Sequence, residues 1–257
     1  MSNIIFIRRQ SDYLPLTTAW IAATSETNTV ILNALNTFEA GLIANSLTGK
    51  FNALYPFVGG TALKHSYNFM NTSLYPLSFV GGWTHTASGS TPNGTNSHAD
   101  TTLVPSVVLG LNNVHLSVYT RTNTNIGVDI GVAQSVPSRA MFLAARNGGT
   151  VLGNINQVTN TLVATANSLG YFVVSRSGVT TTDIYKNGSS ITASTVVTNI
   201  VPSVSIYLSA RRFNATLDSR TTRQLASASI GSDLTDGEIS TLYTLIQNMQ
   251  TSLNRQV

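Results

Sequence analysis

The chain has 257 residues, of which 42% are hydrophobic and only 9% charged, and Ser, Thr and Asn are abundant in place of charged residues. This composition supplies a full core, argues against disorder, and gives a surface of hydroxyls and amides that suits strands and turns better than helices. The net charge of +4 comes without a dense basic stripe, which argues against a nucleic-acid partner, and the lack of cysteine excludes disulfides, thiolate metal sites and cysteine nucleophiles.

The N-terminal segment alternates weakly over residues 3–7, which predicts a strand or an anchoring arm. The basic pair Arg8-Arg9 follows this short apolar run, whereas a signal peptide needs the reverse order and a longer apolar segment. No apolar run is long enough to cross a membrane. We therefore expect a protein that is made in a cytoplasm and is not inserted into a membrane.

An irregular apolar stretch that includes Trp20 precedes the first clear helix, which is predicted over residues 29–47. Its apolar residues recur at helical spacing and are Ile31, Leu35, Phe38 and Leu42. Such a helix either packs against the rest of the chain or contacts a partner, and both interpretations stay open. On the second interpretation residues 1–50 form an attachment arm, and the candidate partner-binding residues are Arg8, Arg9, Trp20 and Phe38.

From residue 51 onward, short alternating apolar runs are interrupted by Gly, Asn and Pro. Their spacing of about ten residues predicts an antiparallel sandwich or barrel over residues 51–257, and the lack of strand–helix alternation argues against a parallel α/β fold. The segment 84–95 is loop-like. The predicted strands are 67–70, 77–79, 102–103, 114–120, 128–130, 141–145, 152–155, 170–176, 182–186, 204–210 and 224–230.

The strongest local signal lies at the C-terminal end of the chain. Thr235 and Glu238 have the spacing of a capping box, in which each side chain binds an amide at the start of a helix. The residues that follow form a helical apolar stripe and are Ile239, Leu242, Ile246, Met249 and Leu253. This pattern predicts a helix docked on the sandwich.

The acidic residues argue against catalysis. Hydrolysis of a glycosidic bond, the main chemistry expected of a sandwich, needs two carboxylates about 5–10 Å apart. No Glu occurs between Glu39 and Glu238, and the aspartates of residues 40–230 are isolated in sequence: Asp100, Asp129, Asp183 and Asp218. Two of them could still meet in space. We nevertheless expect a protein without enzymatic activity.

The histidines and arginines show no metal or cofactor pattern. The four histidines lack the spacing of a helical zinc site and are His65, His85, His98 and His115. We therefore expect no resident metal or cofactor. The second adjacent arginine pair, Arg211-Arg212, lies near Arg220 and Arg223 in sequence. Such clusters either bind a neighbouring protein or are solvated.

One segment has the composition of a sugar-binding site. Residues 83–100 combine aromatic rings with amides, hydroxyls and a carboxylate, and Arg121 follows at a distance. The alternative is that Trp83 belongs to the core and that Asn93-Gly94 only makes a tight turn. The candidate ligand-binding residues are Trp83, His85, Asn93, Asn96, His98, Asp100 and Arg121.

Local motifs resemble a known family of sandwiches. Tyr185-Lys-Asn-Gly-Ser is similar to a hairpin of concanavalin A-like domains of the laminin-G type, with Asn187-Gly188 as its type I′ turn. The closing segments Ser229-Ile-Gly and Leu234-Thr-Asp-Gly-Glu-Ile are similar to the last strand and helix of that family. Three further motifs resemble a group of bacteriophage structural proteins: Tyr55-Pro-Phe-Val-Gly-Gly-Thr-Ala, Phe79-Val-Gly-Gly-Trp-Thr-His and Pro92-Asn-Gly-Thr.

The resemblance covers roughly residues 27–257 and implies a mainly β, antiparallel jelly-roll sandwich with an N-terminal helix and a docked C-terminal helix. It implies a virion protein, exposed on the particle as a fibre, an appendage or a capsid decoration. Its expected partners are other virion proteins, further copies of itself and a host surface glycan. A purely structural module between virion subunits and a free soluble lectin are the alternatives. The family's acidic calcium motif has no match here, so calcium is not expected.

Overall fold

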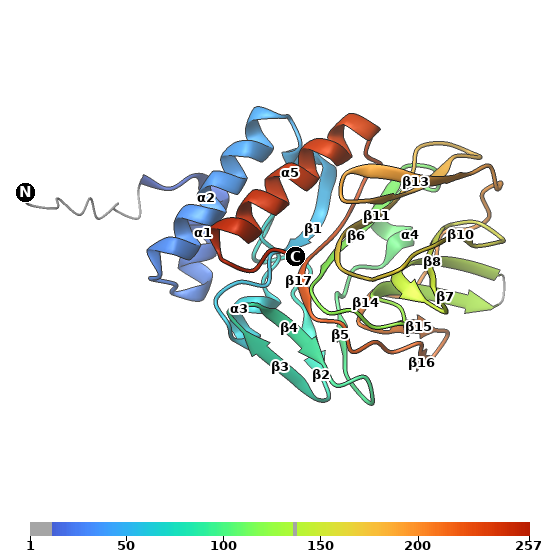
Figure 1. Cartoon of the computed structure of the whole chain (residues 1–257), viewed down its shortest axis with the longest axis horizontal. Helices are drawn as coiled ribbons and strands as arrows, with labels where there is room; N and C mark the ends of the chain where they lie inside the picture. Colours follow the sequence, from blue (N-terminus) through green and yellow to red (C-terminus); the bar gives the residue numbers. More distant parts are fainter. Residues whose placement is uncertain (1–11, 136–137) are drawn as a thin grey trace, which may run out of the picture.

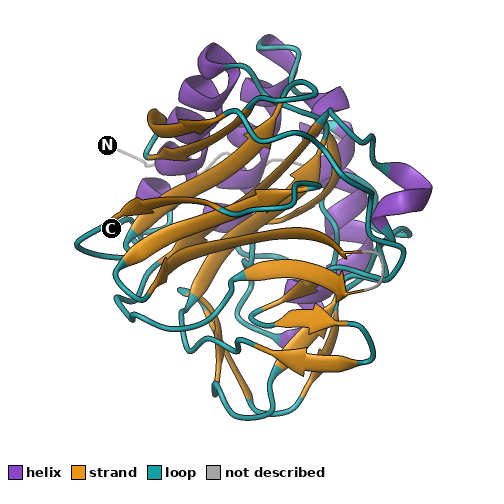
Figure 2. Cartoon of the chain, turned by 90° about the vertical axis from the view of Figure 1, so that its right-hand side faces the viewer, coloured by secondary structure: helices purple, strands orange, loops and turns teal. Residues whose placement is uncertain are grey.

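The structure is a computed structural model, and it describes residues 12–135 and 138–257. Two antiparallel sheets pack face to face, and helices cover the outer face of one of them (Figure 1). Figure 2 views the molecule from the side of the other sheet, whose strands lie towards the viewer. The chain is therefore a mainly β antiparallel sandwich, as its strand spacing predicts.

The first sheet has eight strands within the described residues, in the order β13-β12-β11-β6-β17-β4-β3, with β1 paired to β17. Its strands are β1 (Phe51–Tyr55), β3 (Trp83–Thr86), β4 (Gly89–Pro92), β6 (Val114–Thr120), β11 (Gly170–Arg176), β12 (Thr182–Lys186), β13 (Ser189–Ser194) and β17 (Leu225–Gly231). The turn between β12 and β13 has positive φ at both Asn187 and Gly188, which confirms the predicted type I′ hairpin.

The second sheet has nine strands within the described residues, in the order β10-β9-β8-β7-β14-β5-β2, with the β15–β16 hairpin attached to β7. Its strands are β2 (Ser78–Val80), β5 (His98–Asp100), β7 (Ile130–Ser135), β8 (Ser138–Asn147), β9 (Thr150–Ile155), β10 (Thr161–Ala164), β14 (Tyr207–Leu208), β15 (Arg211–Phe213) and β16 (Thr216–Asp218). The β15–β7 pair is parallel, and the other pairs are antiparallel.

Helices occur mainly near the two ends of the chain. The described helices are α1 (Pro15–Thr24), α2 (Thr29–Ala44), the 3₁₀ turn Thr48–Lys50, α3 (Ala62–Ser66), α4 (Pro105–Val108) and α5 (Asp236–Ser252). The capping box predicted for α5 is present, with Thr235 accepting from the Glu238 amide and Glu238 accepting from the Thr235 amide. Helices α2 and α5 pack against each other over the first sheet (Figure 1).

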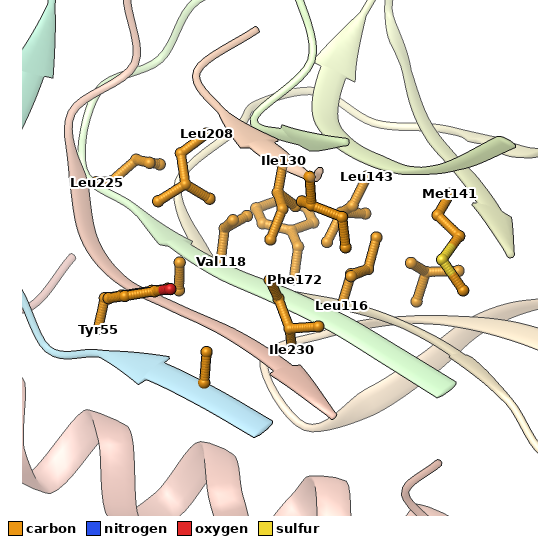
Figure 3. Packing of buried hydrophobic residues seen from close by; sticks show 14 of the residues in the cluster. Tyr55, Leu116, Val118, Ile130, Met141, Leu143, Phe172, Leu208, Leu225 and Ile230 are labelled. Atoms are coloured by element: carbon orange, nitrogen blue, oxygen red, sulfur yellow. The ribbon is translucent and has the colours of Figure 1, made fainter. Parts of the chain in front are cut away.

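Alternation along the strands divides the buried side chains into two layers. Side chains of β6 and β11 such as Val118 and Phe172 point between the sheets and meet Ile130 and Leu143 from the second sheet (Figure 3). The intervening residues of the same strands point the other way, towards α2 and α5. Strands β6 and β11 are buried along their whole lengths, because one face meets the other sheet and the other face meets the helices.

Several sequence predictions differ from the structure. The strands predicted at 67–70 and 102–103 are not strands, and the loop predicted at 84–95 contains β3, β4 and their hairpin. At the first of these segments the buried Asn68 side chain accepts from the amide of Leu54 and donates to the carbonyl of Asn52. A side-chain amide thus provides the hydrogen bonds that a paired strand would otherwise make.

Helix α1 lies in the stretch that the sequence presents as irregular. Its first amides, on Leu16 and Thr17, both donate to the carboxylate of Glu39 at 2.8 Å. Glu39 belongs to α2 and is buried. The cap of α1 is therefore a tertiary contact from a residue more than twenty positions away, which no local capping signal announces.

Candidate functional site

The predicted sugar-binding residues do not form one cluster. Trp83 lies in β3 with its ring packed against the core between the sheets. Its Nε1–H donates to the carbonyls of Val80 at 3.0 Å and His98 at 3.2 Å, and its ring meets Phe79 edge-on at 5.0 Å. Trp83 therefore ties β3 to β2 and β5, which is the core role that the sequence left open.

His85 faces a second histidine. The Nδ1 atoms of His85 and His65 lie 3.0 Å apart, so one ring donates to the other, and Ser90 Oγ is 3.2 Å from the same atom of His85. Burial, and secondarily the charges of His85 and Arg255, lower the pKa of His65 to about 3. The Nδ1 atom of each ring thus has the other ring as its hydrogen-bond partner, and His85 faces His65 rather than an external ligand.

Asn93 and Asn96 build a turn. The Oδ1 of Asn93 accepts from the amides of Thr95, Asn96 and Ser97, and its Nδ2 donates to Asn96 Oδ1 at 2.8 Å. Asn96 Oδ1 also accepts from the amide of Gly82. Most of the amide groups of this pair are thus used within the loop.

Arg121 is held by the C-terminal segment. Its Nε donates to the carbonyl of Arg255 at 2.5 Å, and its Nη1 donates to Gln224 Oε1 at 2.6 Å. Arg255 itself is buried and donates to the carbonyls of Pro56 and Phe57. Arg121 therefore helps to fix the chain end beside the first sheet.

His98 and Asp100 point away from the core, on the outer face of the second sheet. The intervening Ala99 faces the core, and Tyr207 on the neighbouring strand β14 lies directly opposite Asp100. The rings of His98 and Tyr207 stack with centroids 5.1 Å apart and planes inclined by 9°. Two of the predicted ligand residues thus meet an aromatic side chain more than a hundred positions further along the chain.

Two arginines complete this group. The guanidinium carbon of Arg212 lies 5.5 Å from the ring centroid of Tyr207, and its Nη1 donates to Ser205 Oγ at 3.1 Å. Arg220 precedes Thr221, whose amide donates to the carbonyl of Ser209 at the end of β14, and its charge contributes to lowering the pKa of His98, although burial is the larger cause. We call His98, Asp100, Tyr207, Arg212 and Arg220 the Tyr207 cluster.

The electrostatics of the Tyr207 cluster are mixed. Burial, and secondarily the carboxylate of Asp100, raise the pKa of the Tyr207 hydroxyl. One oxygen of Asp100 accepts from the amide of Thr102 at 2.8 Å, which fixes the carboxylate beside the ring. The half-buried cluster therefore presents a neutral hydroxyl and a neutral imidazole between two guanidiniums and one carboxylate at neutral pH.

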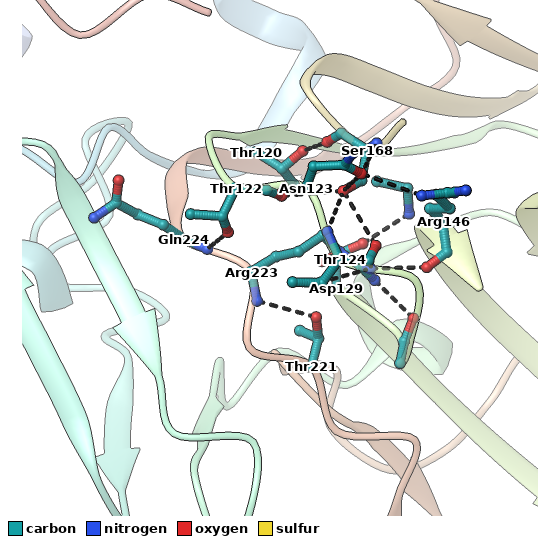
Figure 4. A network of polar contacts seen from close by, with 12 residues as sticks. Thr120, Thr122, Asn123, Thr124, Asp129, Arg146, Ser168, Thr221, Arg223 and Gln224 are labelled. Carbon is teal, nitrogen blue, oxygen red and sulfur yellow. Dashed lines mark hydrogen bonds and ion pairs between the residues drawn. The ribbon is translucent and has the colours of Figure 1, made fainter. Parts of the chain in front are cut away.

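Arg223, three residues after Arg220, forms a buried ion pair with Asp129 that fixes this segment (Figure 4). Arg223 Nε lies 2.6 Å from Asp129 Oδ1, and both side chains are fully buried. The same guanidinium donates to the carbonyls of Thr124, Gly127 and Arg146. One arginine thus joins the loop between β6 and β7 to the end of β8 at the rim of the second sheet.

The predicted partner-binding residues have other positions. Trp20 and Phe38 are only 0% and 2% exposed and belong to the core under the helices. Their prediction as surface contacts is therefore wrong, because the amphipathic stripe of α2 faces α5 and the first sheet instead of a partner. Arg8 and Arg9 lie outside the described residues.

Two aspartates that are distant in sequence do meet. Tyr185 donates its hydroxyl to Asp236 at 2.6 Å, and Asp183 lies 3.4 Å from the same oxygen. Burial, and secondarily the charge of Asp236, raise the pKa of Asp183. This arrangement fastens the first turn of α5 to β12.

Within the described residues, no group of three or more His, Asp or Glu side chains could hold a metal ion.

The hollows of the surface lie elsewhere. One of about 140 Å³ is lined by Asn28, Val30, Ile31, Val58, Gly59, Ala87, Leu253 and Asn254. Another of about 320 Å³ is lined by Asn52, Val108, Leu109, Gly110, Asn113 and Ser232. None of the predicted ligand residues lines these two hollows.

In the part of the chain that the structure describes, no helix is both long and apolar enough to cross a membrane.

Sequence reasoning missed Tyr207, which has no local motif. It identified the pair Arg211-Arg212 and nearby Arg220 as a cluster, and the structure divides that cluster. Arg211 pairs with Asp218 at 2.7 Å, whereas Arg212 turns to Tyr207. The available signal was therefore the clustered arginines, without any sign that β5 would lie beside them.

Comparison with known proteins shows the fold. No family model matches the sequence, and no curated protein matches it. Domain 4 of AbnA, a GH43 extracellular arabinanase from Geobacillus stearothermophilus solved in complex with arabinotriose, is similar over 75% of this chain and 98% of that domain, with a TM-score of 0.51 and 13% identity.

Two toxin domains are similar to the same extent. The botulinum neurotoxin serotype D binding domain matches 78% of this chain and 53% of its own length, with a TM-score of 0.52 and 12% identity. The receptor binding domain of the C/D mosaic serotype matches 77% and 51%, with a TM-score of 0.52 and 11% identity. The chain spans about half the length of these toxin domains. At such low identities the likeness establishes the sandwich fold.

Proposed function

We propose that the chain is a non-catalytic, glycan-binding sandwich displayed on a bacteriophage particle. The Tyr207 cluster is the observation that carries this proposal. It lies on the outer face of the second sheet, whereas α2 and α5 cover the outer face of the first sheet (Figure 1). A domain of similar fold that is matched over 98% of its own length was solved in complex with arabinotriose.

The chemistry of the cluster suits a saccharide. Sugar hydroxyls are recognised by side chains that donate and accept hydrogen bonds around an aromatic ring, and such sites are formed by a few polar groups that converge. Tyr207 and His98 supply the rings, Arg212 and Arg220 supply donors, and Asp100 supplies an acceptor.

The arrangement of the carboxylates supports a binding role. Asp129 is buried in its ion pair with Arg223, and Asp218 is paired with Arg211. Asp183 and Asp236 both lie at the Tyr185 hydroxyl, where they hold α5. Asp100 is the one acid of the Tyr207 cluster, and it forms no salt bridge with another described residue. Hydrolysis of a glycosidic bond would need a second carboxylate there.

The particle context rests on the motif resemblance. The part of residues 1–50 that precedes α2 attaches the chain to other virion proteins, and the sandwich is displayed outward as part of a homo-oligomer. Mass spectrometry of purified particles tests the particle context, and absence of the chain from intact particles would contradict it. A chain that is present in particles but binds no saccharide at millimolar concentration would instead be a structural module between subunits.

A glycan array with the full chain tests the binding site. We expect binding that Tyr207→Ala abolishes, because the substitution removes the ring on which His98 and Arg212 stack. Tyr243→Ala is the matched control, since Tyr243 is a half-buried tyrosine that stacks on Tyr171 at the helix side. Equal binding by both variants would exclude the Tyr207 cluster as the site. Release of reducing sugar from a bound glycan would contradict the non-catalytic role.

A further inference from the structure

Charge is distributed unevenly between the two sides of the sandwich. Most described carboxylates lie on the helix side, in the group Glu26, Glu39, Asp183, Asp233, Asp236 and Glu238. The second sheet and its loops carry the arginines Arg139, Arg146, Arg211, Arg212, Arg220 and Arg223. The described acids of this second side are Asp100, Asp129 and Asp218. The other described cations lie on or beside the first sheet and the helices, where acids balance them: Lys50, Lys64, Arg121, Arg176, Lys186 and Arg255. The excess of cations over carboxylates is thus on the side that the helices leave open.

The carboxylates of the second side do not neutralise Arg212 and Arg220. Asp129 and Asp218 are each bound to an arginine other than Arg212 and Arg220. Among the described residues, no carboxylate forms a salt bridge with Arg212 or Arg220. The nearest contacts of Arg212 are the Ser205 hydroxyl, the Tyr207 ring and the carbonyl of Asn214.

Internal hydrogen bonds restrain these arginines only weakly. Arg220 Nη1 donates to the carbonyl of Leu217 at 3.3 Å, and its Nη2 forms no hydrogen bond with another described residue. None of the hydrogen bonds between described residues uses Nη2 of Arg212. Each guanidinium therefore keeps donors for an external acceptor, and two parallel N–H groups match a carboxylate or sulfate.

We infer that the glycan bound at the Tyr207 cluster is acidic, with its carboxylate or sulfate groups bound by the guanidiniums that flank the ring pair, Arg212 at Tyr207 and Arg220 near His98. This inference rests on the proposed glycan-binding function and names its substrate class. Asp100, which lies opposite Tyr207 in the β5–β14 pair, accepts from sugar hydroxyls. A neutral saccharide would leave both guanidiniums without a counter-charge.

The test is an array that pairs each acidic saccharide with its neutral counterpart. The probes are trigalacturonate with its methyl ester, sialyllactose with lactose, and a sulfated with an unsulfated disaccharide. We expect at least one acidic probe to bind about tenfold or more tightly than its neutral partner, because one charge-assisted hydrogen bond can account for such a ratio. The ratio is expected to fall as salt is raised.

Variants assign the effect to the cluster. Arg212→Gln and Arg220→Gln are expected to remove the preference for the acidic member, whereas Arg211→Gln, whose partner is Asp218, is expected to keep it. Equal loss in all three variants would overturn the assignment of the anion site. An oligonucleotide that competes as well as the acidic saccharide would also overturn it, since it would show a general polyanion surface.

The outcomes separate this inference from the proposed function. Neutral members that bind as tightly as acidic members, with Tyr207→Ala still abolishing binding, would overturn the acidic class and leave the glycan-binding function intact. No binding of any probe by the full chain would contradict both.

Discussion

Strand alternation places side chains on both outer faces of the sandwich, but the two faces differ in whether those side chains are buried under helices or exposed to solvent. On the first sheet the outward residues are large and apolar or aromatic, such as Tyr119, Tyr171 and Val173, and helices bury them. On the second sheet the outward residues near β5 and β14 are His98 and Tyr207, which stay half-exposed. A sheet face that is buried under helices cannot also bind a ligand, so the helices determine which sheet is available for binding.

The comparison also shows how an open face is made rigid. The helix side gains its stability from a large apolar layer between α2, α5 and the first sheet. The rim of the second sheet beside the Arg220 segment has the smaller apolar cluster of Val128, Phe142 and Ala144, together with the buried Arg223–Asp129 pair (Figure 4). Substitutions in these two regions should therefore differ in kind as well as in size.

The largest effect is expected at the buried ion pair. Asp129→Ala leaves the Arg223 guanidinium buried without a counter-charge, and we expect a loss of about 3–5 kcal/mol in the free energy of unfolding. Urea denaturation measures it. Asp218→Ala is the control, because it breaks the more exposed Arg211 pair and should cost less than about 1 kcal/mol. Similar losses in both variants would show that burial of the pair does not matter.

The apolar layer of the helix side comes next. Leu35→Ala in α2 should lower the free energy of unfolding by about 2–5 kcal/mol, because Leu35 is fully buried and its truncation leaves a cavity. The matched change is Leu162→Ala in β10 of the second sheet, where the side chain is 59% exposed. There the expected change is within about 0.5 kcal/mol. Comparable costs at both leucines would remove the contrast between the two sides.

Acid should weaken the helix side through His115. The carbonyl of Ser232 can only accept, so His115 Nδ1 carries the proton and Nε2 accepts from the Ser229 hydroxyl. Burial is the main cause that lowers the pKa of this neutral ring from 6.5 to about 4. Between these values the unfolded chain binds a proton that the folded chain does not. This contribution to stability is present above pH 6.5 and is lost as the pH falls towards 4.

The size of that loss is on the order of 3 kcal/mol by pH 4. Urea denaturation at several pH values measures it, and His115→Gln should flatten the dependence between pH 6.5 and 4. His98→Gln on the open face is the control and should change the slope less, since that ring is only partly buried. An unchanged slope in His115→Gln would assign the acid sensitivity to other groups.

The smallest effect is expected at the cap of α5. Thr235→Ala removes the hydroxyl that accepts from the Glu238 amide and should cost about 0.5–2 kcal/mol in thermal or urea unfolding. Thr244→Ala, at an exposed position inside the same helix, should cost nothing, because alanine has the higher helix propensity. If Thr235→Ala costs as much as Leu35→Ala, then capping and not packing holds the helices on the first sheet.

Local signals predicted the elements whose partners are close in sequence. Strands over 114–120, 170–176 and 182–186 match β6, β11 and β12, and the Asn187-Gly188 turn and the Thr235 cap are present as expected. Helix α1 was missed because its N-terminus is capped by Glu39 from α2. The false strand at 67–70 has the same kind of cause, since the Asn68 side chain bonds to β1.

The candidate site could be predicted only in part. His98 and Asp100 were identified from composition, but the same reasoning joined them to Trp83, which lies behind β5 and donates to the carbonyl of His98. These residues are separated because Trp83 lies in β3 of the first sheet and packs against the core, whereas the side chain of His98 points to the outer face of the second sheet. Tyr207 and Arg212 joined the site because β14 pairs with β5, and nothing in the sequence specifies that pairing.

By itself, the sequence determined the class of the fold, the docked C-terminal helix and the main hairpin, because alternation, capping and turn preferences act over a few residues. The tertiary structure decided which sheet the helices cover, which rings face solvent and which carboxylates are already paired. Those choices depend on contacts between residues about a hundred positions apart, such as Asp129 with Arg223 and Asp100 with Tyr207. Each is set by the packing of whole elements, and a local pattern carries no record of it.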